Sequence, residues 1–141
     1  MRCRDLFDAK AWRKYKGRDR LCRLVSIADG DSAHHRWNVP AQCGVVLTGK
    51  QRVFAGYFVQ VVLPSGDEVL AEDPHILWKA LARVEQKLNA LGWSLDAIGL
   101  DPHWQESGLS ANSGYGFHPD VDGAVHFFEP PNEPPASSAR L

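Results

Sequence analysis

The sequence DPHILWKALARVEQKLNALG, residues Asp73–Gly92, predicts one long amphipathic helix. At 100° per residue its apolar side chains share one arc of about 140°, which is typical of a helix that covers a core. Asp73 and Pro74 suit the helix start, because Asp can accept bonds from free backbone N–H groups and proline has no N–H. Gly92 suits a left-handed residue that ends the helix. The arc consists of Ile76, Leu77, Ala80, Leu81, Val84, Leu88 and Leu91.

The residues before this helix predict an antiparallel meander. Cys43–Gly49 is typical of a strand, and GKQ is typical of a turn. Arg52–Pro64 is rich in valine and aromatic residues and is apolar on both faces, which predicts a central strand covered on one side by the helix. The sequence PSGD indicates a turn, and Glu68–Ala71 a short returning strand that leads to Asp73.

The residues after the helix predict a strand, a long loop and a last strand. Trp93–Leu100 is the strand, and residues 101–122 form a loop with glycines, prolines and aromatic residues. A loop of this length in a compact domain is often functional. GAVHFFEP, residues 123–130, predicts the last strand. A proline-rich tail, which we expect to be flexible, follows over residues 130–141.

The N-terminal part is less regular. Residues 5–16 predict a short helix ended by Gly17, and residues 21–27 fit either a strand or a continuation of that helix. Residues 28–42 predict a polar loop. Taken together, the patterns predict an α+β fold with a mostly antiparallel sheet of about four to six strands, one long helix on it and a short N-terminal helix. We expect a single domain over residues 1–129.

Charge is distributed unevenly between the two parts of the chain. The 141 residues carry a net charge of −1, but residues 1–23 have nine Lys/Arg and three Asp/Glu, a balance of +6, and the remainder has a balance of −7. Such asymmetry can mark a charged partner. The three cysteines are widely spaced, so we expect neither a disulfide framework nor a zinc knuckle. No apolar run is long enough to span a bilayer and no secretory signal is present, so we expect a cytoplasmic protein.

Several histidines and carboxylates cluster late in the sequence. His103, Glu106, His118, Asp120 and His126 could assemble a metal or acid–base site, yet their spacing matches no zinc motif. The sequence also has no HExxH, GxSxG or GxGxxG motif. We therefore expect no catalytic residue, metal or cofactor, and keep an enzyme using these residues as an alternative.

Acidic and aromatic residues after the helix favour a binding surface. One negative face there would complement a basic active site, such as that of a nuclease. On the helix, Trp78 lies about 60° outside the apolar arc, either packed or exposed as a partner contact. The basic row Lys79, Arg83 and Lys87 fits a solvated margin of that arc. The acidic residues are Asp96, Asp101, Glu106, Asp120, Asp122 and Glu129.

Three phrases carry a resemblance to a known group: LARVEQKLNALGW at Leu81–Trp93, ESGLSANSGYGF at Glu106–Phe117 and VHFFEP at Val125–Pro130. With the order of elements, they resemble the small bacterial immunity proteins of contact-dependent growth-inhibition and related polymorphic toxin systems, over roughly residues 45–130. The resemblance implies a non-enzymatic cytosolic protein that binds and neutralises one cognate toxin domain, often a nuclease. The basic N-terminal segment departs from it.

We therefore expect an antitoxin that occludes the active site or substrate surface of a toxin domain, and that is a monomer or weak dimer in isolation. A nucleic-acid-binding module using residues 2–23 is a further alternative, although the acidic remainder would repel phosphates. The expected partner contacts are Trp78, Asp96, Asp101, His103, Trp104, Glu106, Tyr115, Phe117, His118, Asp120 and Asp122.

Overall fold

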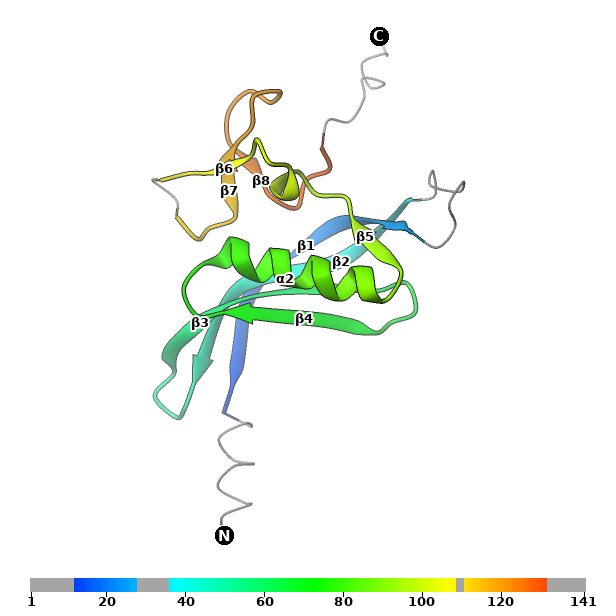
Figure 1. Cartoon of the computed structure of the whole chain (residues 1–141). Helices are drawn as coiled ribbons and strands as arrows, with labels where there is room; N and C mark the ends of the chain where they lie inside the picture. The colour runs from blue at the N-terminus through cyan, green and yellow to red at the C-terminus, as the bar shows by residue number, and fades with distance from the viewer. Residues whose placement is uncertain (1–11, 28–35, 109–110, 132–141) are drawn as a thin grey trace.

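The computed structural model describes residues 12–27, 36–108 and 111–131. In this part of the chain a five-stranded sheet, a three-stranded sheet and one α-helix form an α+β fold, as the sequence predicts (Figure 1). The elements are β1 Lys14–Ser26, β2 Arg36–Thr48, β3 Val53–Val62, β4 Glu68–Asp73, α2 Leu77–Ala90, β5 Trp93–Leu95, the 3-10 turn η2 Ile98–Leu100, β6 Gln105–Glu106, β7 Tyr115–Phe117 and β8 Val125–His126.

The large sheet is antiparallel throughout and has the order β4-β3-β2-β1-β5. The small sheet has the order β6-β7-β8 and is also antiparallel. The predicted meander is confirmed, because β2, β3 and β4 are consecutive neighbours. The PSGD turn is confirmed as well, with the Leu63 N–H bonded to the Asp67 carbonyl at 2.8 Å.

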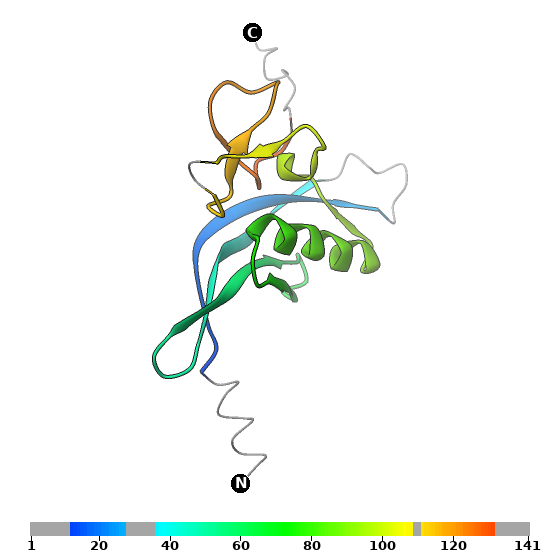
Figure 2. The ribbon, with the colours of Figure 1, turned by 60° about the vertical axis from the view of Figure 1, so that its left-hand side comes forward.

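A pair of facing glycines lets β1 and β2 approach closely. Gly17 lies opposite Gly44, and a Cβ on Gly44 would lie 2.1 Å from the carbonyl oxygen of Lys16. The buried ring of Phe58 occupies the space beside Gly17, where a Cβ would lie 2.8 Å from it. A side chain at either glycine would force the strands apart. Figure 2 shows the long curve of β1 at this end of the sheet.

Helix α2 begins three residues after the predicted start, with Leu77 instead of Pro74 as its first residue. Asp73 is still part of β4, and its carboxylate accepts hydrogen bonds from the N–H groups of His75 at 3.0 Å and Ile76 at 2.8 Å. Asp73 therefore stabilises the turn before the helix, and the cap position belongs to Ile76. The predicted end is confirmed, because Gly92 has a φ of +91° just after the last turn.

The helix covers one half of one face of the large sheet. Its buried residues are those of the predicted arc from Leu77 to Leu88, and α2 packs on β3 and β4. Leu91, at the end of the arc, is 57% exposed. The residues after β5 cover the other half with fully buried rings, Phe127 and Phe128. Burial of a side chain of this size stabilises the fold by about 1.5–3 kcal/mol.

Two predictions about the N-terminal part are wrong where the structure describes it. Residues 14–16, expected in a helix, belong to β1, and residues 36–42, expected in a loop, belong to β2. The two strands pair from Lys14↔Leu47 to Val25↔Arg36, and this long ladder outweighs the weak helical preference of the sequence. Residues 5–11 and 28–35 lie outside the described residues. For residues 21–27 the strand alternative is correct up to Ser26.

The strands predicted after the helix are shorter than expected. Only Trp93–Leu95 pairs with β1, and Ile98–Leu100 forms a 3-10 turn. The chain leaves β1 here because the N–H groups of Ile98 and Gly99 bond instead to the carbonyls of Glu129 and Phe127, at 2.7 and 3.0 Å. The expected loop 101–122 contains β6 and β7, and the last strand shrinks to Val125–His126. Within the described residues, neither α2 nor η2 has the length and apolar content that a bilayer-spanning helix requires.

Candidate functional site

The expected partner contacts differ widely in exposure. His103, Tyr115, Phe117, Asp120 and Asp122 are exposed, and Phe117 is the most open of the aromatic ones at 51%. Four more are half-buried, and Trp104 and His118 are buried at 8% exposure each. The half-buried residues are Trp78, Asp96, Asp101 and Glu106.

Three of the half-buried residues have intramolecular partners. Asp96 forms a salt bridge of 2.9 Å with Arg23, and the indole of Trp78 donates to a backbone carbonyl at 2.6 Å. Glu106 accepts a 2.6 Å hydrogen bond from the backbone N–H of Asn112. These side chains hold segments together, which limits what they can offer to a partner.

The carboxylate of Asp101 lies close to His103 and His118, two of the expected partner contacts. It accepts a 2.8 Å bond from the backbone N–H of His103, and its Oδ1 lies 3.2 Å from His103 Nδ1 and 3.4 Å from His118 Nε2. The backbone bond, followed by the contacts with both rings, lowers the pKa of Asp101. His118 Nδ1 accepts the N–H of Asp120 at 3.1 Å, while its buried Nε2 lies near Asp101 without forming a hydrogen bond. The Asp101 carboxylate therefore links the turn that contains His103 to the segment that contains His118.

The residues proposed for an enzyme lie in three separate places. His103, His118 and Asp120 belong to the Asp101 turn, Glu106 holds Asn112, and His126 lies beneath β7 beside Cys43. No group of three metal-ligating side chains in the described ranges is arranged to hold an ion.

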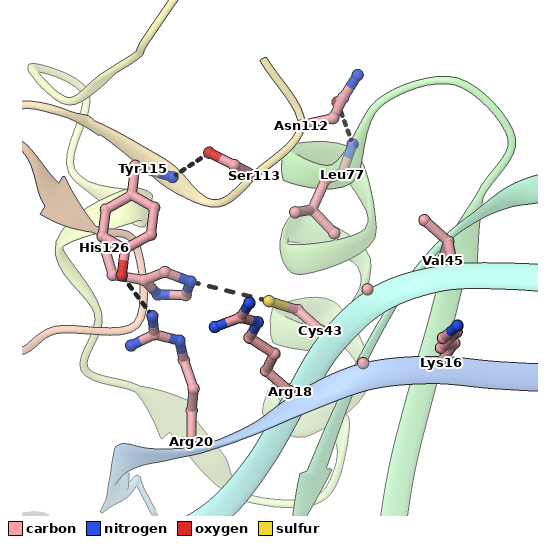
Figure 3. Close-up of a pocket in the computed structure, with 12 residues that line it drawn as sticks. Lys16, Arg18, Arg20, Cys43, Val45, Leu77, Asn112, Ser113, Tyr115 and His126 are labelled. Atoms are coloured by element: carbon pink, nitrogen blue, oxygen red, sulfur yellow. Dashed lines mark hydrogen bonds between the residues drawn. The ribbon is translucent and has the colours of Figure 1, made fainter. Parts of the chain in front are cut away.

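A cavity of about 810 Å³ opens between the large sheet, the small sheet and the first turn of α2 (Figure 3). Three cationic side chains of β1 line one wall, and the small sheet forms the opposite wall. Among the described residues that line it, none carries a carboxylate. The lining residues are Lys16, Gly17, Arg18, Arg20, Cys43, Gly44, Val45, Leu77, Asn112, Ser113, Tyr115 and His126.

His126 and Cys43 face each other at the base of this cavity. The Sγ of Cys43 lies 3.8 Å from His126 Nε2, and His126 Nδ1 accepts the N–H of Phe128 at 3.2 Å. The neutral ring therefore carries its proton on Nε2 and cannot take the thiol proton. Burial and then the charge of Arg20 lower the pKa of His126 to about 3. Burial raises the pKa of Cys43 to about 11, so this pair lacks the thiolate that a nucleophile needs.

Gly114 makes room for the buried histidine. It has a φ of +92°, and a Cβ there would lie 2.5 Å from His126 Nε2. Phe127, which directly follows β8, donates its N–H to the Gly114 carbonyl at 2.8 Å. The small sheet thus closes over the imidazole without a gap for a side chain.

Two features of the cavity escape the sequence-based predictions. Asn112 Oδ1 accepts the N–H of Leu77 at 2.9 Å and so caps α2 from a distant segment, which no local pattern indicates. Lys16, Arg18 and Arg20 alternate with a period of two, a strand signal that is lost when these residues are assigned to a helix and a basic segment.

Comparison of the chain with protein-family models, with curated proteins and with solved structures gives no match.

Proposed function

We propose that this chain is a cytosolic immunity protein, which neutralises one toxin domain by covering its active site or substrate surface. The proposal starts from the resemblance of the segments around Glu106–Phe117 and Val125–Pro130. The toxin domain is expected to be a nuclease. The chain acts by binding and needs no cofactor.

The exposed aromatic face of β7 is the observation that carries this proposal. Tyr115 and Phe117 point to the same side of the strand and are 38% and 51% exposed, while Gly116 between them is buried against Trp104. Aromatic side chains are enriched among the residues that dominate binding energy at protein interfaces. Phe117 therefore suits the centre of a contact surface.

The way in which the small sheet is attached to the core also supports an immunity function. Trp104 and Phe127 are buried on its inner side, with ring centroids 6.1 Å apart, so the exposed aromatics stand on a fixed support. The exposed acids Asp120 and Asp122 follow β7 directly. A rigid aromatic surface with acids at its margin suits the basic substrate surface of a nuclease.

The test is binding of the purified chain to the toxin domain encoded immediately upstream. Calorimetry should detect a tight complex, and coexpression should protect cells from the toxin. Phe117→Ala should weaken the complex by at least about thirtyfold, the loss of about 2 kcal/mol that a hot-spot aromatic contributes.

Phe54→Ala is the matched control, because Phe54 is an equally exposed phenylalanine, at 50%, near the turn between β2 and β3. It should leave the affinity unchanged. Weaker binding of Phe54→Ala with normal binding of Phe117→Ala would move the interface to the hairpin. No binding and no protection by the wild-type chain would refute the immunity function.

A further inference from the structure

One face of β1 changes from apolar to basic along its length. Alternate residues of a strand point to the same side, so Leu24 and Cys22 share a face with Arg20, Arg18 and Lys16. The first two are buried in the core, and the last three line the cavity. Neighbouring members of this basic row stand about 7 Å apart along the strand. The row therefore places three positive charges on one wall.

Elsewhere in the fold, basic side chains form salt bridges with carboxylates. Arg23 forms a salt bridge with Asp96, and Arg83 forms one with Asp73 at 3.0 Å. In the described part of the chain, neither Arg18 nor Lys16 has a carboxylate within salt-bridge distance. An uncompensated cluster of cations in a hollow attracts an anion.

Arg20 is positioned by the small sheet. Its Nη2 donates to the Tyr115 hydroxyl at 2.6 Å, and its guanidinium lies 5.5 Å from the centre of the Tyr115 ring. Figure 3 shows Arg18 and Arg20 rising from β1 toward Tyr115 and His126. The charge of Arg20 lowers the pKa of both His126 and Cys43, although burial has the larger effect on each. Its field therefore reaches the base of the cavity.

The rest of the cavity suits the body of a small organic ligand. Val45 gives an apolar contact, whereas Leu77 borders the cavity at only 1% exposure. The side chains of Ser113 and Tyr115 place hydroxyl groups near the opposite side. The volume of about 810 Å³ lies within the range of about 300–1,000 Å³ that is typical of small-molecule sites. A bare inorganic ion needs neither a cavity of this size nor apolar groups beside the polar ones.

We propose that this cavity binds a small phosphate ester of nucleotide size, with its phosphate held by Arg18 and Arg20 and its organic body beside Val45. A phosphate monoester carries a charge of about −1.5 to −2 at pH 7, which matches a cationic row better than a single carboxylate does. The planar guanidinium groups can donate paired hydrogen bonds to phosphate oxygens. Lys16 adds a third positive charge at the mouth.

Titration of the full chain with adenosine 5′-monophosphate tests the proposal. Calorimetry should show saturable binding that weakens as salt rises, and inorganic phosphate should bind more weakly than the nucleotide. Adenosine, which lacks the phosphate, should not bind measurably. Absence of nucleotide binding at low salt would overturn the proposal, as would equal affinity for inorganic phosphate.

Arg18→Gln should raise the dissociation constant for the nucleotide at least about tenfold, because it removes charge-assisted hydrogen bonds. Lys50→Gln removes an equal charge from the exposed β2–β3 turn and should leave the constant unchanged. Thermal unfolding of each variant verifies its fold. Lys16→Gln, a second exposed position, should weaken binding by a smaller factor. Unchanged binding by both cavity variants would overturn the proposal.

A single-stranded oligonucleotide without terminal phosphate distinguishes the source of the phosphate. Binding weaker than that of the mononucleotide supports a small-molecule site. Tighter binding that is equally lost in Arg18→Gln would overturn the small-ligand proposal in favour of nucleic acid. The toxin-binding test uses Phe117 and a protein partner, so either proposal can fail without the other.

Discussion

The two sheets of this protein are stabilised in different ways. Four strands of the large sheet have six to thirteen residues, with β1 and β2 paired from Lys14 to Val25, and α2 covers part of its apolar face. The strands of the small sheet have only two or three residues. Isolated strands of this length do not persist in water, since even a two-stranded hairpin is marginal. The small sheet therefore depends on docking.

Three kinds of contact dock the small sheet on the rest of the molecule. Phe127 and Phe128 are fully buried, Asn112 caps the first turn of α2, and Tyr115 is bonded to Arg20 of β1. The large sheet is therefore the scaffold, while the cavity and the aromatic face exist only as long as the small sheet stays attached. Substitutions at the docking contacts test this difference.

The largest effect is expected from Phe127→Ala. Phe127 has no exposed surface, and its ring packs 5.1 Å from that of Phe128 and 6.1 Å from that of Trp104, measured between centroids. The free energy of unfolding should fall by about 3–5 kcal/mol because a large cavity is left in the core. Denaturant unfolding measures it. Phe117→Ala, the exposed counterpart, should cost less than about 1 kcal/mol. Equal costs would contradict an anchoring role for Phe127.

An intermediate effect is expected from acid. The folded pKa of His126, about 3, lies below its unfolded value of about 6.5, so the folded state binds fewer protons between these limits. The contribution of His126 to the free energy of unfolding is fully present above pH 6.5. It is lost as the pH falls toward 3, at up to about 1.4 kcal/mol per pH unit. From pH 6.5 to 4.5 the wild-type protein should lose about 2–3 kcal/mol more stability than His126→Gln. If the two proteins lost stability equally as the pH falls, the imidazole would take up its proton in the folded state, without opening of the small sheet.

The smallest effect is expected from Asn112→Gly. This change removes the acceptor of the Leu77 N–H but suits the positive φ of +60° at this position. Stability should fall by about 1 kcal/mol, the typical contribution of one such hydrogen bond. Asn112→Asp keeps an acceptor oxygen and should recover most of the loss. Hydrogen exchange of β7 and of the first turn of α2 should accelerate together in the glycine variant. Acceleration in only one of them would show that the cap does not couple the two regions.

The scaffold is the part of the fold that sequence patterns predict. The arc of α2 has a clear period of 3.6 and β4 a period of two, and burial follows both. Strand β3 is marked instead by valine and aromatic residues on both of its faces. The start of β1 has no apolar period, because Lys14 to Lys16 are exposed and their strand is set by pairing with distant residues of β2. Strand formation there is a consequence of tertiary structure.

The candidate site is only partly predictable for a similar reason. Tyr115 and Phe117 are exposed, whereas Trp104 and His118, expected as partner contacts with them, are buried. The cluster around Asp101 joins histidines that the sequence places 15 residues apart. Strands as short as β6 to β8 leave no periodic signal. The cavity depends on register, because only the pairing of Arg18 with Cys43 shows which side chains share its wall.

The position of Cys43 beneath His126 makes its thiol a reporter of local opening. A raised pKa and 8% exposure keep the thiol unreactive while the small sheet is closed. Cys22, at 3% exposure and with its pKa raised to about 12 by burial, lies deeper in the scaffold. The relative alkylation rates of the two thiols therefore measure how often the small sheet detaches while the scaffold stays folded.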